Sequence, residues 1–285
     1  MMQGMDERHA VVGLLHPGQM GASIGGALVE RGTTVLWASD GRSPETSARA
    51  EAAGLDDAGA VAALVEKSTV VLCICPPSAA VDVALSVAAL GFGGLYVDAN
   101  AVSPGTAGVI QEVIERGGAR FVDGDLIGGP ARPGSGTRLY LSGPDAAEVA
   151  GLFEGSDRVA AVALDGSVTA ASGMKMCYAA WTKGTQALLL AIRTVARAEG
   201  VEAALLAEWS RTQPDLPGRC DFAVASAPKA WRFAGEMDEI ADTFNSRGLP
   251  GGFATAASDV FTRLAAFKGA TPTLDEVVDS LLDAD

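Results

Sequence analysis

Short apolar runs alternate with helical patterns through the first half of the chain. The apolar runs are rich in β-branched residues and predict strands at 10–15, 33–37, 69–75, 94–98 and 120–122. Helical patterns begin between them, near Met20, Pro44, Ala58, Ser78 and Ser103. Near-continuous apolar strands separated by helices are typical of sheets buried on both faces, so this pattern predicts a doubly wound parallel sheet.

The pattern changes after Asp165. Two further predicted strands and a helix precede that point, at 137–141, 158–164 and near Pro144. Residues 166–199 contain no proline and are rich in Ala, Leu and Met, which predicts one long helix. Helical segments follow without strand-like alternation. We therefore expect an α/β domain over residues 1–165, then a long interdomain helix and an all-helical domain over residues 166–285.

The composition describes an acidic chain of 285 residues with a formal net charge of −14. Nucleic acids and anionic membranes attract basic surfaces, so this charge argues against both as partners. The longest apolar runs fall far short of the ~20 residues that cross a bilayer. Residues 1–10 lack the apolar core of a secretory signal, so we expect a cytoplasmic protein.

Four cysteines and two histidines limit the chemistry available to the chain. Their spacing matches neither a disulfide framework nor a zinc site, so the sequence predicts no metal. A GxSxG elbow between a strand and a helix would mark a serine hydrolase; Gly21-Ala22-Ser23-Ile24-Gly25 matches these letters, but it falls inside the helix predicted from Met20 and forms no such elbow.

The first predicted strand runs directly into a glycine-containing turn that opens a helix. We call it the glycine turn; it comprises His16, Pro17, Gly18, Gln19, Met20 and Gly21. Gly18 has no Cβ, so a pyrophosphate can approach the backbone where free helix N–H groups point. Gly21 permits close packing of the helix, and His16 replaces the first glycine of the usual pattern. This arrangement predicts a dinucleotide site, with a purely structural turn as the alternative.

The end of the second predicted strand distinguishes the two nicotinamide cofactors. An acidic residue there binds the ribose of NAD, whereas an arginine accommodates the 2′-phosphate of NADP. Ala38 stands where the acid is expected, and Ser39, Arg42 and Ser43 follow it. Asp40, a turn residue before a glycine, points outward in this interpretation. The sequence therefore favours NADP(H) over NAD(H).

Cys75 ends the third predicted strand, and Pro76 and Pro77 follow it. Proline restricts the backbone, so a rigid turn is expected at the carboxyl edge of the sheet. Doubly wound folds bind ligands at that edge. We therefore include these three residues in the predicted cofactor site.

These segments together resemble the superfamily of β-hydroxyacid and 6-phosphogluconate dehydrogenases, which includes the imine reductases. The glycine turn resembles the first motif of the family, and residues 98–104 resemble the stretch that lines the nicotinamide. Residues 121–129 fall at the substrate motif, and Lys175, nine residues after Gly166, matches the catalytic lysine. The resemblance covers most of the chain. It implies a Rossmann domain, an interdomain helix and a helical domain that pairs in homodimers.

The resemblance also implies roles for individual residues. Lys175 would handle the proton on the oxygen of the substrate, and Tyr178 stands where 6-phosphogluconate dehydrogenases carry a histidine. Asp125, Ile127 and Gly128 fall in the substrate motif. Ile127 replaces a serine that holds a carboxylate in the family, and Asp125 replaces a common proline.

Two further residues have alternative roles. Lys183 lies eight residues after Lys175, on the same face of the predicted helix, where a second cation would bind an anionic substrate. The residue pattern alone favours the alternative, in which Lys175, Tyr178 and Lys183 are solvated on the interdomain helix. Asn100 either hydrogen-bonds the nicotinamide or substrate, or caps the helix that follows.

The residues and the resemblance together predict an NADP(H)-dependent oxidoreductase that exchanges hydride with a small hydroxy or carbonyl compound. An imine reductase is the first alternative, because the serine that holds a carboxylate is missing and Asp125 could pair with an iminium. A module that binds NADP without catalysis is the second alternative.

Overall fold

The computed structural model of the protein describes residues 10–282. Residues 1–9, which contribute to the expectation that no secretory signal is present, lie outside the described residues. The chain divides after Lys175 into two compact units. The boundary expected from the sequence, residue 165, lies ten residues earlier, before the helix in which the division falls.

The first unit contains one eight-stranded sheet. Its strands are β1 (Val11–Leu15), β2 (Thr34–Trp37), β3 (Asp56–Asp57), β4 (Val70–Cys73), β5 (Leu95–Asp98), β6 (Arg120–Ile127), β7 (Thr137–Ser142) and β8 (Val159–Ala163). Their spatial order is β3-β2-β1-β4-β5-β6-β7-β8. The expected doubly wound sheet is confirmed with one exception: β6 and β7 are antiparallel. A loop without a helix, residues 128–136, joins these two neighbours, and such a short connection requires antiparallel strands.

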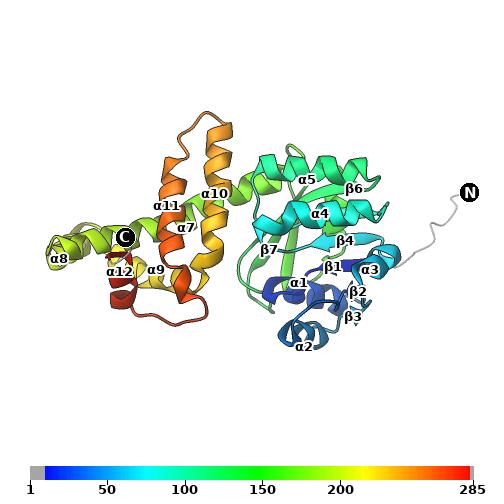
Figure 1. The fold of residues 1–285 in the computed structure, drawn as a ribbon, viewed down its shortest axis with the longest axis horizontal. Coiled ribbons are helices and arrows are strands. Elements are labelled where there is room, and N and C mark those ends of the chain that lie inside the picture. The colour runs from blue at the N-terminus through cyan, green and yellow to red at the C-terminus, as the bar shows by residue number, and fades with distance from the viewer. Residues whose placement is uncertain (1–9, 283–285) are drawn as a thin grey trace, which may run out of the picture. The chain divides into compact units, whose positions relative to one another are not determined.

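Helices cover both faces of this sheet, as Figure 1 shows for α4 and α5 on one side and α1 and α2 on the other. One face packs against α1 (Gln19–Glu30), α2 (Pro44–Ala52) and α6 (Ala146–Gly151). The other face packs against α3 (Val61–Lys67), α4 (Ala80–Ala89) and α5 (Pro104–Arg116), with a short 3₁₀ helix η1 (Pro77–Ala79) before α4. Successive residues of a strand enter opposite cores: Leu14 belongs to the first and Leu15 to the second.

Local sequence explains where α5 begins. Ser103 adopts extended backbone, and its hydroxyl oxygen accepts a hydrogen bond from Thr106 N at 3.1 Å. Pro104 follows at the first helical position, where its missing N–H costs nothing. The Ser-Pro pair therefore fixes the start of the helix that flanks the carboxyl end of β5.

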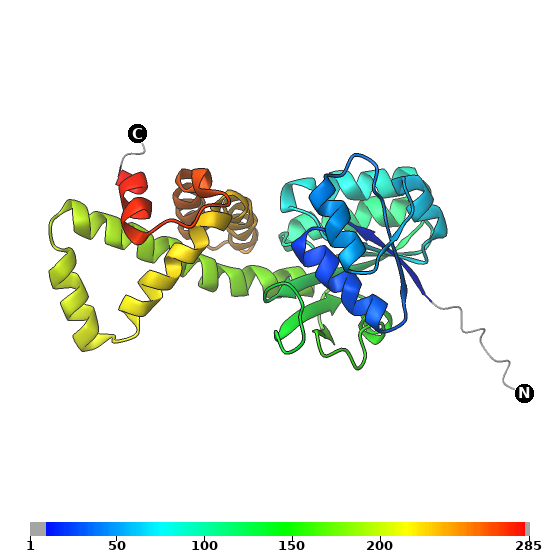
Figure 2. The ribbon, with the colours of Figure 1, turned by 90° about the horizontal axis from the view of Figure 1, so that it is seen from below.

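The second unit is helical throughout its described residues. Its elements are α7 (Ala170–Ala198, which begins in the first unit), α8 (Glu202–Thr212), α9 (Leu216–Ala223), η2 (Val224–Lys229), α10 (Ala230–Ser246), α11 (Gly252–Arg263), η3 (Ala265–Phe267) and α12 (Leu274–Leu282). Figures 1 and 2 both show α10 and α11 side by side. The rings of Phe233 and Phe261 pack edge to face between them, 5.5 Å apart. The predicted long helix and helical domain are thereby confirmed.

Candidate functional site

The glycine turn lies at the carboxyl end of β1. Gly18 precedes α1, and its carbonyl accepts a hydrogen bond from Ala22 N at 2.9 Å. A Cβ on Gly18 would meet no atom of residues 10–282 within 4 Å, so the backbone there is open to a ligand. A Cβ on Gly21 would lie 2.1 Å from His16 O, so only glycine permits this approach of α1 to the turn.

The remaining residues of the turn differ in exposure. Pro17 is buried, Gln19 is exposed, and Met20 packs against the core beneath the sheet. The exposed side of the turn therefore consists of Gly18 and Gln19, at the N-terminus of α1. Helix N–H groups at such a position attract phosphate oxygens.

His16 faces Arg42 across this turn. Its Nε2 lies 3.3 Å from the Arg42 guanidinium, and its backbone N–H donates to Ile74 O at 3.1 Å. Burial, and to a lesser extent the charge of Arg42, lower the pKa of His16 to about 4. The imidazole is therefore neutral near pH 7, and its Nε2 accepts the hydrogen bond, because arginine can only donate.

The loop after β2 holds the residues expected to select the cofactor. Ala38 is buried, whereas Arg42 and Ser43 are exposed and Ser39 is half-buried. The Ser43 hydroxyl caps α2, accepting a hydrogen bond from Thr46 N at 3.3 Å. This loop therefore presents a guanidinium and a helix N-terminus, and both favour a phosphate group.

Arg49 is a residue that the sequence reasoning missed. It lies on α2, and its Nε donates to Pro17 O at 3.4 Å. Its Nη2 donates to Thr46 Oγ1 at 2.8 Å, which holds the guanidinium against the helix. A second guanidinium thus adjoins the glycine turn. The sequence offered one sign of this contact: Arg49 follows Thr46 by three residues, and residues three apart share a helix face.

Asn100 connects the ends of β4 and β5. Its Oδ1 accepts a hydrogen bond from Cys75 N at 2.5 Å, and its Nδ2 donates to Asp98 Oδ1 at 2.6 Å. The side chain is buried. The helix that follows is capped by Ser103 rather than by Asn100. Asn100 therefore fixes the segment after β4, where Pro77 begins η1 and Pro76 is exposed.

Two buried carboxyl groups lie side by side, Asp98 at the end of β5 and Asp123 opposite it in the middle of β6. Burial raises the pKa of Asp98 well above its usual range, and burial raises the pKa of Asp123 to about 7. Asp123 accepts hydrogen bonds from Ser172 N at 2.8 Å, from Ser172 Oγ at 2.6 Å and from Ser142 Oγ at 3.2 Å. These bonds fix the first turns of α7 against β6 and β7.

The anchoring of α7 places Lys175 over β6. Lys175 Nζ lies 2.5 Å from Asp125 Oδ1 and donates to Leu126 O at 2.7 Å. Asp125 is 1% exposed and Lys175 is 9% exposed. The sequence analysis assigned Asp125 to substrate binding, whereas here its carboxylate pairs with the lysine. A buried ammonium requires such a partner, because an unpaired one would lose its hydration without compensation.

The predicted substrate motif continues with Ile127 and Gly128. Ile127 is half-buried at the end of β6, opposite Arg138 on β7. Gly128 has a φ of +119°, and a Cβ there would lie 3.1 Å from Thr137 Cα. Glycine is therefore required where the chain leaves β6.

Tyr178 and Lys183 belong to the second unit. The Tyr178 side chain is exposed. Lys183 forms an ion pair with the buried Glu236, and its Nζ lies 4.7 Å above the centre of the Phe233 ring. The ammonium of Lys183 is thus engaged by α10 within this unit, whereas the sequence analysis expected it to bind an anionic substrate.

Two kinds of feature are absent from residues 10–282. Within this range, no helix is both long and apolar enough to cross a membrane. The same residues contain no group of three or more His, Cys, Asp or Glu side chains placed to hold a metal ion.

Solved structures with this fold match nearly the whole chain. The conserved protein MTH1747 of unknown function, described as similar to 3-hydroxyacid dehydrogenases, is 25% identical over 95% of this chain and 98% of its own, with a TM-score of 0.67. The 3-hydroxyisobutyrate dehydrogenase of Mycobacterium tuberculosis, solved with L-serine, is 17% identical over 96% and 99%, with a TM-score of 0.71. A reductive aminase from Aspergillus terreus, in complex with NADPH and ethyl levulinate, is 17% identical over 95% and 99%, with a TM-score of 0.56.

The family models agree with this fold. No curated protein matches the sequence. A domain of unknown function, DUF1932, matches residues 196–264. The model of the NAD binding domain of 6-phosphogluconate dehydrogenase matches residues 8–155, which is more than half of the chain. The protein is therefore a pyridine-nucleotide-binding protein of the Rossmann class. It belongs to the family of the NAD binding domain of 6-phosphogluconate dehydrogenase, which confirms the resemblance inferred from the sequence.

Proposed function

We propose that the protein is an NADP(H)-dependent oxidoreductase that exchanges hydride between nicotinamide and a small hydroxy or carbonyl compound. The observation that carries this proposal is the buried ammonium of Lys175, 2.5 Å from Asp125 near the carboxyl end of β6. The glycine turn follows β1, and β1 and β6 run parallel in one sheet. A proton donor and a dinucleotide loop at one edge are the two parts that such a reaction needs.

The residues around the glycine turn fit a dinucleotide. The backbone at Gly18 is open, and the N-terminus of α1 attracts the pyrophosphate. Arg49, beside Pro17, adds a positive charge. The segment of Cys75, Pro76 and Pro77 follows β4, the neighbour of β1, and is fixed by Asn100. When bound, the nicotinamide donates or accepts the hydride.

Lys175 handles the proton in this mechanism. In the direction of reduction, its ammonium donates a proton to the carbonyl oxygen of the substrate while hydride reaches the carbonyl carbon. In the direction of oxidation, the amine takes the proton of the hydroxyl group. The Asp125 carboxylate accepts a hydrogen bond from Lys175 Nζ and so positions the ammonium near the end of β6. Tyr178 and Lys183 follow on α7 and remain sequence-based predictions for catalysis and substrate binding.

The preference for NADP(H) over NAD(H) is the second part of the proposal. Its support is the exposed Arg42, together with Ser43 at the N-terminus of α2. Ser39 lies between them and the buried Ala38, where an acidic residue would favour NAD. Arginine binds a phosphate through charge-assisted hydrogen bonds, which NADH cannot supply at the ribose.

An imine is the alternative substrate. A carboxylate beside the reacting group would stabilise an iminium, and Asp125 already holds a cation at this place, the ammonium of Lys175. Ile127 leaves the motif without a side chain that could hold a carboxylate. Gly128, the next residue, is exposed. The reductive aminase with the same fold was solved with NADPH and a keto ester.

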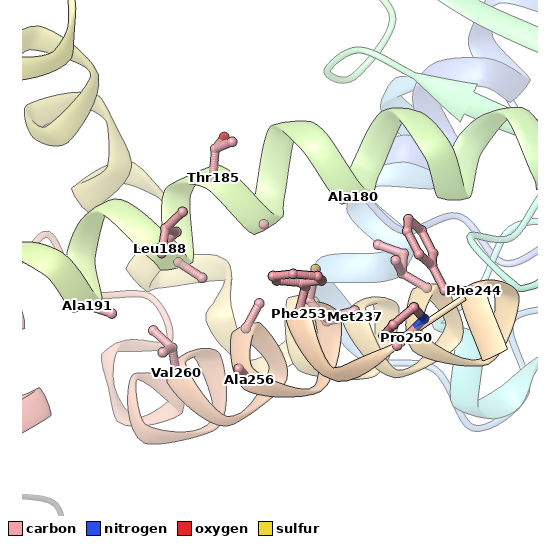
Figure 3. Close-up of a pocket in the computed structure, with 16 residues that line it drawn as sticks. Ala180, Thr185, Leu188, Ala191, Met237, Phe244, Pro250, Phe253, Ala256 and Val260 are labelled. Carbon is pink, nitrogen blue, oxygen red and sulfur yellow. The ribbon is translucent and has the colours of Figure 1, made fainter. Parts of the chain in front are cut away.

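We also propose that the second unit forms a homodimer. An apolar groove of about 300 Å³ lies between α7 and the α10–α11 pair, and Figure 3 shows Leu188 and Phe253 among its lining side chains. Phe253 is 85% exposed. Apolar surface of this kind is typical of interfaces, and the resemblance implies that a second copy covers it. Sedimentation of wild type and of Phe253→Asp tests this proposal, with a monomeric wild type as the contradicting result.

A calorimetric titration with NADPH and, separately, with NADH tests the cofactor assignment. We expect tight binding of NADPH and weak binding of NADH. The NADPH complex is then offered carbonyl compounds, hydroxy acids with NADP⁺, and cyclic imines, and consumption of the cofactor is followed. Reduction of imines alone would select the alternative substrate. Binding of NADPH without turnover of any compound would select a non-catalytic module, and binding of neither nucleotide would contradict the proposal.

A further inference from the structure

Two cysteine thiols adjoin each other where β4 leaves the sheet. Cys73 is the last residue of β4, and Cys75 follows two residues later. Alternate residues of an extended chain point to the same side, and the two Sγ atoms lie 3.8 Å apart. Cys73 is fully buried, whereas Cys75 is partly exposed. An oxidant can therefore reach one thiol, and the second thiol lies directly behind it.

The residue between the cysteines is tied to the glycine turn. Ile74 N donates a hydrogen bond to Leu15 O, and Ile74 O accepts one from His16 N at 3.1 Å. Asn100 spans the two cysteines from the other side: its Oδ1 accepts from Cys75 N, and its Nδ2 lies 3.4 Å from Cys73 Sγ. A change in the geometry of residues 73–75 therefore acts directly on the backbone of the turn.

We propose that Cys73 and Cys75 form a redox site that hydrogen peroxide converts into a disulfide, and that this disulfide weakens dinucleotide binding at the glycine turn. The Cys75 thiolate attacks one peroxide oxygen, the O–O bond breaks, and a sulfenic acid forms with release of water. The Cys73 thiol then attacks the Cys75 sulfur and displaces the hydroxyl as a second water. Two thiols lose two electrons and two protons in total, and one peroxide becomes two waters.

The environments of the two thiols assign these roles. The contact with Cys75 and burial raise the pKa of the Cys73 thiol well above its usual range, so Cys73 stays protonated until it attacks. Cys75 is the thiol that solvent reaches. The other two cysteines lack such a neighbour among residues 10–282: Cys177 is exposed on α7, and Cys220 is buried in α9.

Closing the bond links the disulfide to the cofactor site. The Sγ atoms must approach from 3.8 Å to about 2.0 Å, which contracts the chain on both sides of Ile74. The hydrogen bonds from Ile74 to Leu15 and His16 then change, and so does the bond from Cys75 N to Asn100. Such a constrained bond is readily reduced, so the modification is reversible. By linkage, bound NADPH shifts the equilibrium from the disulfide toward the two thiols.

Peptide mapping of the full chain tests the disulfide without any assumption about function. Trypsin releases both cysteines in one peptide, residues 68–116, which contains no methionine, while Cys177 and Cys220 fall in other peptides. After treatment with hydrogen peroxide, we expect this peptide to lose the mass of two hydrogens. Cys73→Ser and Cys75→Ser should abolish that loss, and Cys177→Ser should not. Added oxygen on the wild-type peptide, without loss of two hydrogens, would overturn the proposal.

Titration of the same samples with NADPH tests the coupling, which rests on the proposed cofactor site. We expect oxidation to weaken NADPH binding by about tenfold and dithiothreitol to restore it. The NADPH affinity of Cys73→Ser should be the same before and after peroxide treatment, and Cys177→Ser should behave as wild type. Unchanged affinity of the oxidised wild type would overturn the coupling.

Hydrogen exchange separates failure of this coupling from failure of the cofactor assignment. Oxidation should speed exchange at the amides of His16 and Ile74, whether or not NADPH binds. Faster exchange in a protein that binds no nucleotide would leave the redox site standing and refute the cofactor assignment. Unchanged exchange despite the disulfide would refute the coupling itself.

Discussion

The carboxyl edge of the sheet and the face formed by α7, α10 and α11 differ in their buried charges and in their exposed apolar surface. At the sheet edge, Asp123 and Asp125 are buried and bound to partners on α7, Ser172 and Lys175. On the helical face of the second unit, one ion pair lies beside an apolar groove. Phe253 extends from that groove into solvent.

This difference separates a site for chemistry from a site for assembly. Burying a charge costs several kcal/mol, so each buried charged group at the sheet edge needs a specific partner. Substitutions that remove a partner there should therefore have large effects on stability or activity. An exposed apolar side chain contributes little to the stability of the free protein, and it contributes binding free energy only when another surface covers it. Substitutions at the carboxyl edge of the sheet therefore test whether this edge is the site of chemistry, and they follow in order of expected effect.

Replacing the proposed proton donor should have the largest effect. Lys175→Ala removes the ammonium that lies 2.5 Å from Asp125. We expect turnover to fall by about 10²–10⁴, the usual contribution of a general acid or base. NADPH affinity, measured by calorimetry, should stay within error, because the ammonium of Lys175 on α7 contacts Asp125 and Leu126 of β6, whereas the glycine turn follows β1. Lys67→Ala, at the end of α3, is the matched control, and equal losses in both variants would refute the role of Lys175.

Replacing Asp125, the other member of this ion pair, should mainly lower the stability of the fold. Asp125→Asn leaves the Lys175 ammonium buried without its counter-charge. The expected loss is about 3–5 kcal/mol in the free energy of unfolding, measured in urea. Glu66→Gln, an exposed carboxylate on α3, should change little. The double variant Lys175→Met with Asp125→Leu should recover most of the loss, and a double variant as unstable as Asp125→Asn would contradict this account.

The sequence predicted the first unit well because local chemistry determines it. Apolar runs gave the strands, and Ser103 with Pro104 placed the start of α5. The two-residue strand β3 was missed, since two aspartates carry no strand signal and only pairing with β2 defines it. The antiparallel β6–β7 pair was missed for a related reason: a strand pattern does not state the direction of its neighbour.

The site was only partly predictable. The glycine turn is contiguous in sequence, so its residues could be recognised together. The Lys175–Asp125 pair joins residues fifty positions apart, and it depends on how the Ser172–Asp123 bonds seat α7 on β6. Arg49 reaches Pro17 through tertiary packing alone. Such contacts have no sequence period, and therefore pattern analysis does not find them.

Cofactor preference should respond to the loop after β2. Arg42→Ala removes the exposed guanidinium beside His16. A charge-assisted hydrogen bond contributes about 1.5–3 kcal/mol, so NADPH binding should weaken about 10- to 100-fold. NADH binding should be nearly unchanged, because NADH lacks the 2′-phosphate. Arg31→Ala, at the far end of α1, is the control; equal weakening for both nucleotides would remove Arg42 from the choice of cofactor.

The last expected effect is a change in the pH dependence of stability, which is small over any single pH unit. The pKa of Asp123 is about 7 in the folded protein and near 3.8 without burial, so the folded state holds its proton more tightly. Asp123 therefore favours folding at low pH, and this contribution is lost as the pH rises from about 4 to about 7, by at most about 1.4 kcal/mol per pH unit. His16 has the opposite sign: its pKa falls from 6.5 to about 4 on folding, so its contribution is lost as the pH falls through that range.

Urea unfolding from pH 4 to pH 8 should separate these two groups. Asp123→Asn removes the carboxyl group, so the free energy of unfolding should rise more steeply with pH than in wild type, whatever its absolute value. His16→Asn should change the slope in the opposite direction. Asp157→Asn, an exposed carboxylate, should leave the wild-type slope. An Asp123→Asn slope equal to that of wild type would mean that the Ser172 and Ser142 hydrogen bonds outweigh burial and hold Asp123 ionised.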